Sequence, residues 1–539
     1  MTRRVKSSIA FFITAIVLLV IGYIISGGGL SIPTLGLNST RLLGTTVLPS
    51  SKLSSMIKGK EDITAPSISL DSISIPYDES SNTIFIPQSI SNTDWTGLLS
   101  SSDGNLYLES DSLVIDGSLD KLSLISEGHN FHIYQISANN YHIYNAVFTG
   151  MPVIRIDEDS LSIYDPDHSD SRLENIKCTT EIHGSSSIHF DKPSYNLKLA
   201  KDKLSLAGLR VDDDWILNSL YNDDGLIHER LSYDLWHEFA ESNNTANDTS
   251  VSMRFVELFK DSEYQGVYGL LERIDSKSLG LSKKDKLYKC KSPSHEGPGD
   301  DDFYSVLTDS MYPNFVIKYP KEKEYELSDW APLKAWTDTF CSDEAPILKV
   351  DNVDSPLLIN PSADSSSPSV YLNLDSATDY ALFIMLICGL DNTMKNTYYV
   401  ARYQDDNTYI IDEIPYDLDM TWGDSWIDND DLMSTIYMPE NATNPDAWTR
   451  DMKALYENNP DVIYDLLASR YSDLRQKIIT PDHILSLVSS YYDYLYSTGA
   501  YNRNFTKWPV RTTVWDDEYI YDYINNRIEY LDQYFGYVS

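Results

Sequence analysis

The sequence predicts an α+β protein of several parts: an N-terminal transmembrane helix, a small β-sandwich and a larger domain that mixes strands with helices. Three observations support this. At 539 residues the chain is too long for one compact core. One uncharged stretch lies near the start, and short segments of alternating apolar and polar residues follow it. From about Pro152 onward, longer helical patterns join the strands. We therefore expect a transmembrane segment at 1–27, a linker at 28–65, the β-sandwich at 66–150 and the larger domain at 151–539.

The N-terminal segment has the pattern of a signal anchor. Arg3, Arg4 and Lys6 precede a stretch without charges from Ile9 to Ile25, which is at the short end of the roughly 17–25 residues that span a bilayer. Cations on this side keep the N-terminus cytoplasmic, so the remaining chain is expected outside the cell membrane in a single-pass topology. A cleaved signal, and hence a secreted protein, is the alternative.

The segment from 66 to 150 contains short strands such as "SISIPYDESSNTIFIPQSI", broken by Asn, Ser, Asp and Gly. Alternation of this kind places one face of a strand on a core and the other in water. We interpret it as a small β-sandwich with a binding or spacing role.

The larger domain is predicted to contain strands and helices in a definite order. The elements that we expect are the strand "KPSYNLKLA", the helix "GLIHERLSYDLWHEFA", the strand pair "MRFVELFKDSEYQGVYGLLERI", the buried helix "DYALFIMLICGLDNT", the hairpin "NTYYVARYQDDNTYIIDEIPYDLD" and the final helix "WDDEYIYDYINNRIEYLDQYFG". Cys178, Cys290, Cys341 and Cys388 form no CxxC pair, so either two disulfides or four buried thiols fit the sequence.

Charge excludes one class of partner. Acidic residues number 81 against 42 basic ones, which gives a formal net charge of −39. Such a surface repels polyanions, so nucleic acid is not an expected partner.

Two motifs carry candidate chemistry. In "IPYDLDMTWG", Asp417 and Asp419 lie in an apolar frame that holds carboxylates in place and partly dehydrates them, as a divalent cation requires. Upstream, Asp391 and Asn396 have the D-x-x-x-x-N spacing of a kinase catalytic loop, in which the Asp is the base and the Asn binds metal. The alternatives are a helix cap or surface residue for Asp391, and turn-formers or a calcium site that holds a loop for the other two acids.

The segments "DDDWILNSLYNDDGLIHERLSYDL", "VELFKDSEYQGVYGLLERID", "LDNTMKNTYYV" and "IPYDLDMTWG" occur in this order. Together they resemble the CotH spore-coat protein kinase family, over roughly Val153 to the C-terminus. The resemblance implies an atypical, two-lobed kinase fold that phosphorylates Ser or Thr hydroxyls of coat or surface proteins, with ATP as co-substrate and Mg²⁺ or Mn²⁺ as the cation. It implies Asp391 as catalytic base, with Asn396, Asp417 and Asp419 as metal ligands.

Kinases also place a lysine on the nucleotide phosphates and orient it with a glutamate. Lys198, on the polar side of its strand, is our first candidate, and Lys192 is the alternative. A solvated strand lysine is the simpler reading of Lys198. Glu238, on the helix that follows, or Glu272 in "LLERI" would orient the lysine.

The sequence departs from the family pattern at two arginines. The common "RGN" is "HGS" here, starting at His183, and His228 replaces the arginine after "LI". Imidazole cannot reproduce bidentate phosphate contacts. The segment "KSPSHEGPGDDDFYS" is expected to be a mobile loop near the cleft. A glycine-rich phosphate clamp is disfavoured there, because Asp300 to Asp302 would repel phosphate.

Two functional classes follow from the sequence. The first is a membrane-anchored protein kinase, and the second is a non-catalytic surface protein, structural or adhesive, on a kinase-like fold. Glycoside hydrolysis is disfavoured, because two adjacent aspartates do not give carboxyls that face each other across a sugar.

Overall fold

The structure is a computed structural model, and it is a mixed α+β protein as predicted. The residues that it describes are 41–63, 68–92, 94–184, 186–243, 249–290, 315–321, 324, 326–341, 355–361, 367–393, 395–426, 435–437, 442–444, 447–509 and 518–538. They form two compact units: the first runs to Ile75 and includes Ser81–Ile86 and Ile90–Phe148, and the second comprises Pro76–Ser80, Pro87–Ser89 and the chain from Thr149 onward.

The predicted membrane anchor at 1–27 lies outside the described residues. Within the described ranges, every helix is too short or too polar to cross a bilayer.

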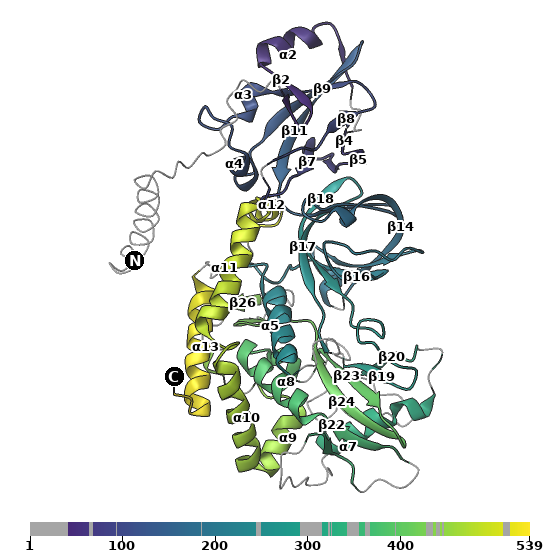
Figure 1. Cartoon of the computed structure of the whole chain (residues 1–539), viewed down its shortest axis with the longest axis vertical. Coiled ribbons are helices and arrows are strands. Elements are labelled where there is room, and N and C mark those ends of the chain that lie inside the picture. Colours follow the sequence, from purple (N-terminus) through teal and green to yellow (C-terminus); the bar gives the residue numbers. More distant parts are fainter. Residues whose placement is uncertain are drawn as a thin grey trace, which may run out of the picture. The chain divides into compact units, whose positions relative to one another are not determined.

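The first unit is built mainly from strands (Figure 1). Its larger sheet has the order β1 (Arg41–Leu42), β2 (Thr45–Leu48), β9 (Asn105–Glu109), β10 (Phe131–Ile136), β11 (Asn140–Thr149), β7 (Thr83–Pro87), and β3 (Glu61–Asp62) pairs with β11. A second sheet has the order β5 (Ile73–Ser74), β4 (Ile68–Leu70), β8 (Leu99–Ser101). Three short helices are α2 (Ser50–Ile57), α3 (Ser110–Leu113) and α4 (Lys121–Ser126), and β6 (Tyr77–Asp78) belongs to the second unit.

The predicted linker at 28–65 requires a correction. Residues 41–63 form β1, β2, α2 and β3 instead of an extended tether. Leu42, Leu43 and Leu53 are buried there, so this Leu-rich stretch contributes to the core of the first unit although its sequence has no clear period.

The second unit begins with a closed β-barrel (Figure 1). Its strands, in spatial order, are β12 (Val153–Asp157), β13 (Ser160–Tyr164), β14 (Arg172–His183), β15 (Ser194–Leu199), β16 (Asp214–Asn218), β18 (Glu263–Glu272) and β17 (Met253–Lys260). The predicted strand at "KPSYNLKLA" is β15, with Leu197 and Leu199 buried and Lys198 exposed, and the predicted strand pair is β17 and β18. Helix α5 (His228–Ser242) connects β16 to β17 and begins two residues later than its apolar pattern.

A six-stranded sheet and helices follow the barrel in the second unit. The sheet has the order β20 (Phe315–Tyr319), β19 (Lys286–Cys290), β23 (Thr397–Tyr403), β24 (Thr408–Pro415), β22 (Ser369–Leu372), β21 (Leu357–Leu358). The predicted hairpin is β23 and β24, and the predicted buried helix is α8 (Leu374–Ile387), which is apolar on all sides because it lies inside this part of the core. Shorter elements here are α7 (Ala331–Phe340), α9 (Arg450–Asn458), β25 (Asp424–Trp426), β26 (Thr435–Tyr437), and 3₁₀ turns at Leu327–Trp330 and Leu390–Thr393. Two further 3₁₀ turns, Ser169–Ser171 and Ser186–His189, connect strands of the barrel.

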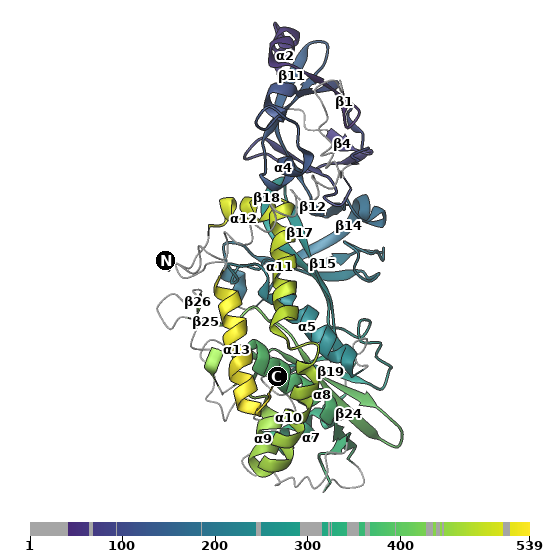
Figure 2. The ribbon, with the colours of Figure 1, turned by 60° about the vertical axis from the view of Figure 1, so that its left-hand side comes forward.

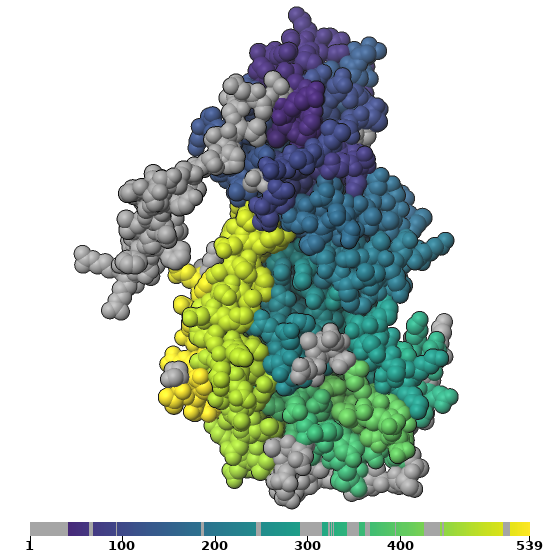
Figure 3. All heavy atoms as spheres, viewed as in Figure 1, coloured from purple at the N-terminus to yellow at the C-terminus, as the bar shows by residue number. Residues whose placement is uncertain are grey.

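The C-terminal helices cover one side of the second unit. They are α10 (Pro460–Arg475), α11 (Pro481–Ser497), α12 (Ala500–Lys507) and α13 (Tyr519–Phe535), the last being the predicted final helix. Helix α11 lies beside α13, and α12 packs on β18 of the barrel (Figure 2). In the space-filling view these helices form a continuous yellow-green strip (Figure 3).

The four cysteines are free thiols, and Cys178, Cys290 and Cys388 are buried, so the structure favours thiols over disulfides. The acidic loop at "KSPSHEGPGDDDFYS" lies outside the described residues.

Candidate active site

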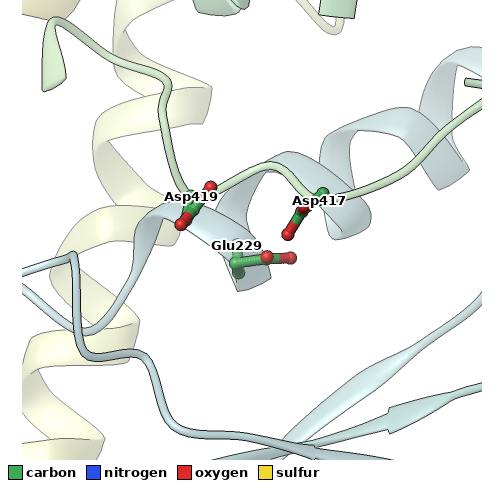
Figure 4. Close-up of side chains that lie close together, drawn as sticks. All are labelled: Glu229, Asp417 and Asp419. Atoms are coloured by element: carbon green, nitrogen blue, oxygen red, sulfur yellow. The ribbon is translucent and has the colours of Figure 1, made fainter. Parts of the chain in front are cut away.

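Three carboxylates converge at the start of α5. Glu229 extends from the first turn of this helix, and Asp417 and Asp419 come from the loop that follows β24 (Figure 4). One oxygen from each lies within 4.8 Å of the other two. Hard divalent cations prefer carboxylate oxygens, so this cluster has the donor set of a magnesium or manganese site.

The turn before α5 places Glu229 in this cluster. The carboxylate of Asp223 accepts hydrogen bonds from the backbone N–H groups of Gly225, at 2.7 Å, and of His228, at 2.6 Å. Asp223 therefore fixes the entry to the helix, and Glu229 follows in the first turn, where a carboxylate is favoured by the helix dipole.

Glu229 is almost completely buried, with 1% of its surface exposed. Its Oε1 accepts hydrogen bonds from the Leu418 N–H at 3.2 Å and from the Asn218 amide at 3.1 Å. Its Oε2 is also buried, without a hydrogen-bond partner among the described residues. Burial raises the pKa of Glu229 well above its usual range, and the charges of Asp417 and Asp419 raise it further. An oxygen in this condition gains most from a bound cation.

The two aspartates differ in their surroundings. Asp417 is exposed and has a left-handed backbone with φ of 60°, a conformation that carries strain in a residue other than glycine. The Asp419 carboxylate accepts hydrogen bonds from the Asn222 amide and from the Met420 N–H, both at 2.9 Å. Burial raises the pKa of Asp419 to about 7, and the charge of Asp417 acts in the same direction. The three carboxyl groups therefore lie close enough to disfavour one another's ionised forms.

Asp391 lies in the 3₁₀ turn after α8, at the end of the buried helix as predicted. Its Oδ2 accepts hydrogen bonds from the Asn396 amide at 3.1 Å and pairs with the Lys395 ammonium at 2.9 Å. Burial raises the pKa of Asp391, Lys395 opposes this effect, and the charge of Asp417 adds to it. Asp391 and Asp417 are thus close enough to influence each other, which a shared site requires.

The structure therefore brings together the predicted residues Asp391, Asn396, Asp417 and Asp419. The Asn396 backbone is left-handed, with φ of 56°, and its amide group points to Asp391. Lys395, the neighbour of Asn396, is affected by the whole acidic group: burial alone would lower its pKa, but Asp391, Asp417 and Asp419 raise it overall.

The predicted lysines are placed elsewhere. Lys198 is more than half exposed and forms ion pairs with Asp214 at 3.2 Å and Asp213 at 3.8 Å. Lys192 is buried and donates hydrogen bonds to the Val267 carbonyl at 2.6 Å and to the Asn504 side chain at 3.0 Å, both polar but uncharged partners.

The predicted orienting glutamates also require a correction. Glu238 pairs with His483 at 2.6 Å, and Glu272 accepts hydrogen bonds from the backbone N–H groups of Arg210 and Ser252. The expected lysine–glutamate pair is therefore wrong within the described contacts, because each member has a different partner. Sequence reasoning did not identify Glu229, which accepts a hydrogen bond from the Asn218 amide eleven residues earlier. Its only sequence signal was an acid in the first turn of a helix beside the predicted motif.

The two histidines that replace family arginines occupy different positions. His228 is fully buried, and its Nδ1 lies 3.3 Å from the Asp419 carbonyl oxygen. His228 therefore contacts the loop that carries Asp417 and Asp419. His183, at the end of β14, lies 2.8 Å through Nε2 from the Tyr416 hydroxyl. The ammonium of Lys289 lies 3.8 Å from the centre of the Tyr416 ring.

Cations near the cluster were also missed by sequence reasoning. Burial, together with the charges of Lys289 and Arg273, lowers the pKa of His183 to about 4. Both cations therefore lie near the end of β14. Arg273 is anchored through its Nε to Asp214 at 2.5 Å. Arg273, Lys289 and Lys395 thus form a cationic group, defined by these residues, beside the acidic cluster.

A cluster of three carboxylates beside a D-x-x-x-x-N turn, with cations nearby, is the kind of site that phosphoryl transfer uses. The family model described as CotH kinase protein matches residues 180–531. This range covers more than half of the chain, so the chain belongs to the CotH kinase family, and the resemblance seen in the sequence is confirmed. No curated protein matches this chain.

Proposed function

We propose that this chain is an atypical protein kinase that transfers the γ-phosphoryl group of ATP to Ser or Thr hydroxyls of coat or surface proteins. Family membership supports a kinase-like enzyme. The observation that carries the proposal is the convergence of Glu229, Asp417 and Asp419, whose carboxylate oxygens lie within 4.8 Å of one another, near the Asp391 carboxylate that Asn396 hydrogen-bonds. On this view the barrel and the six-stranded sheet with its helices are the two lobes.

The acidic cluster fits a divalent cation. Glu229, Asp417 and Asp419 would hold Mg²⁺ or Mn²⁺, and Asn396 could add a neutral oxygen. The bound cation would supply positive charge to neutralise the phosphates. The buried, unpartnered Oε2 of Glu229 and the raised pKa of Asp419 support the fit, because both are relieved by a positive charge.

Asp391 is proposed as the base that orients the substrate hydroxyl. The serine or threonine oxygen forms the new bond to Pγ as the bond from Pγ to the β–γ bridging oxygen breaks, and ADP leaves with that electron pair. The hydroxyl proton passes to the Asp391 carboxylate. Lys395, at 2.9 Å, keeps this carboxylate oriented and charged before the reaction.

The cationic group of Arg273, Lys289 and Lys395 would contact the phosphates. Its members lie near the acids, whereas Lys198 is held by Asp213 and Asp214. Arginine and lysine donors on transferring phosphates act through charge and hydrogen bonds in a partly dry site.

The cellular setting is proposed from the sequence. The segment Ile9–Ile25 would anchor the chain in the cell membrane, with the kinase domain outside the cytoplasm. The expected partners are a Ser/Thr-rich protein substrate and the membrane, and not nucleic acid.

The test is transfer of radiolabel from γ-labelled ATP to a Ser-rich coat or surface protein by the full chain. We expect Asp417→Ala and Asp391→Asn to reduce labelling by about 10²-fold or more. Asp405→Asn is the matched control, because Asp405 lies in the exposed turn between β23 and β24. Labelling of equal strength by wild type and Asp417→Ala would refute the proposal.

A non-catalytic surface protein is the second candidate. It is favoured by the ion pairs that hold Lys198 and by the burial of His228 under the Asp419 loop, where neither reaches a phosphate as the family arginine and lysine were expected to. A thermal-shift measurement with ATP and Mg²⁺ or Mn²⁺ separates the candidates: stabilisation supports the kinase, and an unchanged melting temperature supports the non-catalytic protein.

A further inference from the structure

A hydrogen bond joins the end of the barrel strand β14 to the loop that carries Asp417 and Asp419. His183 Nε2 and the Tyr416 hydroxyl are 2.8 Å apart, although the two residues are 233 positions apart in the chain. Tyr416 directly precedes Asp417, the exposed member of the acidic cluster. The hydrogen bond therefore holds the residue next to Asp417, the candidate metal ligand.

The direction of this hydrogen bond follows from the charge states. The pKa of His183 is about 4, mainly because the ring is buried, whereas a phenol ordinarily has a pKa of about 10. At neutral pH the imidazole is uncharged and the phenol keeps its proton. Tyr416 therefore donates and His183 Nε2 accepts, while Asn196 hydrogen-bonds to the same imidazole.

Tyr416 is fixed at each of its polar groups. Its N–H donates to the Asn396 carbonyl at 3.0 Å, and its carbonyl accepts from the Asn392 amide at 2.8 Å. Lys289 covers one part of the ring, and Tyr398 packs edge-on with ring centres 5.5 Å apart. Among the contacts just named, the hydroxyl contact is the one that connects Tyr416 to the barrel, at β14.

The next two residues transmit the position of Tyr416. Asp417 adopts the left-handed conformation, and Leu418 is fully buried with its N–H bound to Glu229 at 3.2 Å. Asp417 thus lies between two fixed neighbours, and the direction of its carboxylate depends on both.

We propose that His183 is a positioning residue that acts through the Tyr416 hydroxyl to hold the Asp417 carboxylate over Glu229. The inference rests on the proposed function, because it concerns the same metal site. An arginine at this position could only donate to the phenol oxygen, so it would reverse the direction of the hydrogen bond and leave the phenol proton without this acceptor. The histidine is then an acceptor for the loop and not a replacement for a phosphate ligand.

The experiment is isothermal titration of the full chain with Mn²⁺ alone. We expect His183→Ala and Tyr416→Phe each to weaken affinity by about 5- to 10-fold, the factor that one net hydrogen bond contributes. The double variant should match the single ones, since both remove the same bond. His183→Gln offers an amide oxygen and should stay within about twofold of wild type.

His189→Ala is the matched control, an exposed histidine in the turn that follows β14. Additive losses in the double variant, or wild-type affinity in His183→Ala, would overturn the inference. Asp417→Ala is titrated alongside. If wild type and Asp417→Ala bind Mn²⁺ equally, the metal site and the inference both fail. If the histidine effects appear but no phosphate is transferred, the inference stands and the kinase proposal fails.

Discussion

The side-chain amide of Asn392 donates hydrogen bonds to the carbonyls of Asn396, at 3.1 Å, and of Tyr416, at 2.8 Å. The turn that carries Asp391 and the loop that carries Asp417 are therefore one hydrogen-bonded unit. This contact explains how two acids on separate segments come to share a site.

We expect Asn392→Ala to lose phosphotransfer by at least 10-fold, because both segments would move relative to each other. The variant should also lose roughly 1–3 kcal/mol of folding free energy, since buried carbonyls lose their donor. Denaturant unfolding and labelling assays measure the two effects. Asn360→Ala is the control: Asn360 bonds the backbone at Pro368 and Val370, so it should lose stability without a comparable loss of activity per folded molecule.

Glu229→Gln tests the residue that sequence reasoning missed. Removing a buried charge beside two aspartates should leave the melting temperature of the metal-free protein unchanged or higher, because burial already disfavours the ionised Glu229. The same change should weaken Mn²⁺ binding by about 10-fold or more, as measured by calorimetry. Glu238→Gln, on the same helix but paired with His483, should bind Mn²⁺ as wild type does. Equal behaviour of the two variants would remove Glu229 from the site.

Glu413 on β24 and Asp451 on α9 are a buried, hydrogen-bonded carboxyl pair. Burial raises the pKa of Asp451 to about 6 and that of Glu413 well above its usual range. Since the folded state holds these protons more tightly, the pair contributes stability that is fully present below about pH 4 and is lost as the pH rises through 6 and beyond.

Glu413→Gln should therefore gain stability relative to wild type as the pH rises from about 4 to 8. Urea unfolding at several pH values measures the difference. Glu457→Gln, exposed on the same helix α9, should show no such trend. A difference between Glu413→Gln and wild type that stays constant over this range would mean that the pair does not share a proton.

Arg503 and Glu257 form a buried ion pair between α12 and β17, with Nε and Oε1 at 2.9 Å. Tyr264 and Thr149 also donate to this carboxylate, both at 2.6 Å. We expect Arg503→Ala to cost roughly 3–5 kcal/mol of folding free energy, because it leaves a charge buried without its partner. The double variant Arg503→Leu, Glu257→Leu should cost less than Arg503→Ala in the same unfolding assay.

Local patterns in the sequence predicted much of the fold. The alternation around Lys198 predicted β15, and the apolar run around Phe383 predicted α8. In both cases the order of apolar and polar residues along the segment shows which faces are buried. The spacing of Asp391 and Asn396 indicated a pair that acts together, and the two side chains are hydrogen-bonded because both belong to one short segment. Partners across the chain were not predictable in this way. Lys192 meets Val267 and Asn504 rather than a phosphate or a carboxylate, and no local pattern encodes that choice.

The acidic cluster shows the same limit of prediction from local sequence. Asp417 and Asp419 were found because their apolar neighbours are unusual for adjacent acids. Glu229 belongs to an amphipathic helix in which an acid is ordinary, and only the return of the chain after β24 brings it to the aspartates.

The contact of α12 with β18 has a consequence for the order of events in synthesis. Asn504 accepts hydrogen bonds from the Val267 N–H at 3.1 Å and from Lys192, and 237 positions separate Val267 from Asn504. A nascent chain that has just completed its last barrel strand lacks these partners, and the buried ammonium of Lys192 then has one acceptor fewer. The barrel therefore gains this support only after the chain as far as α12 has been synthesised.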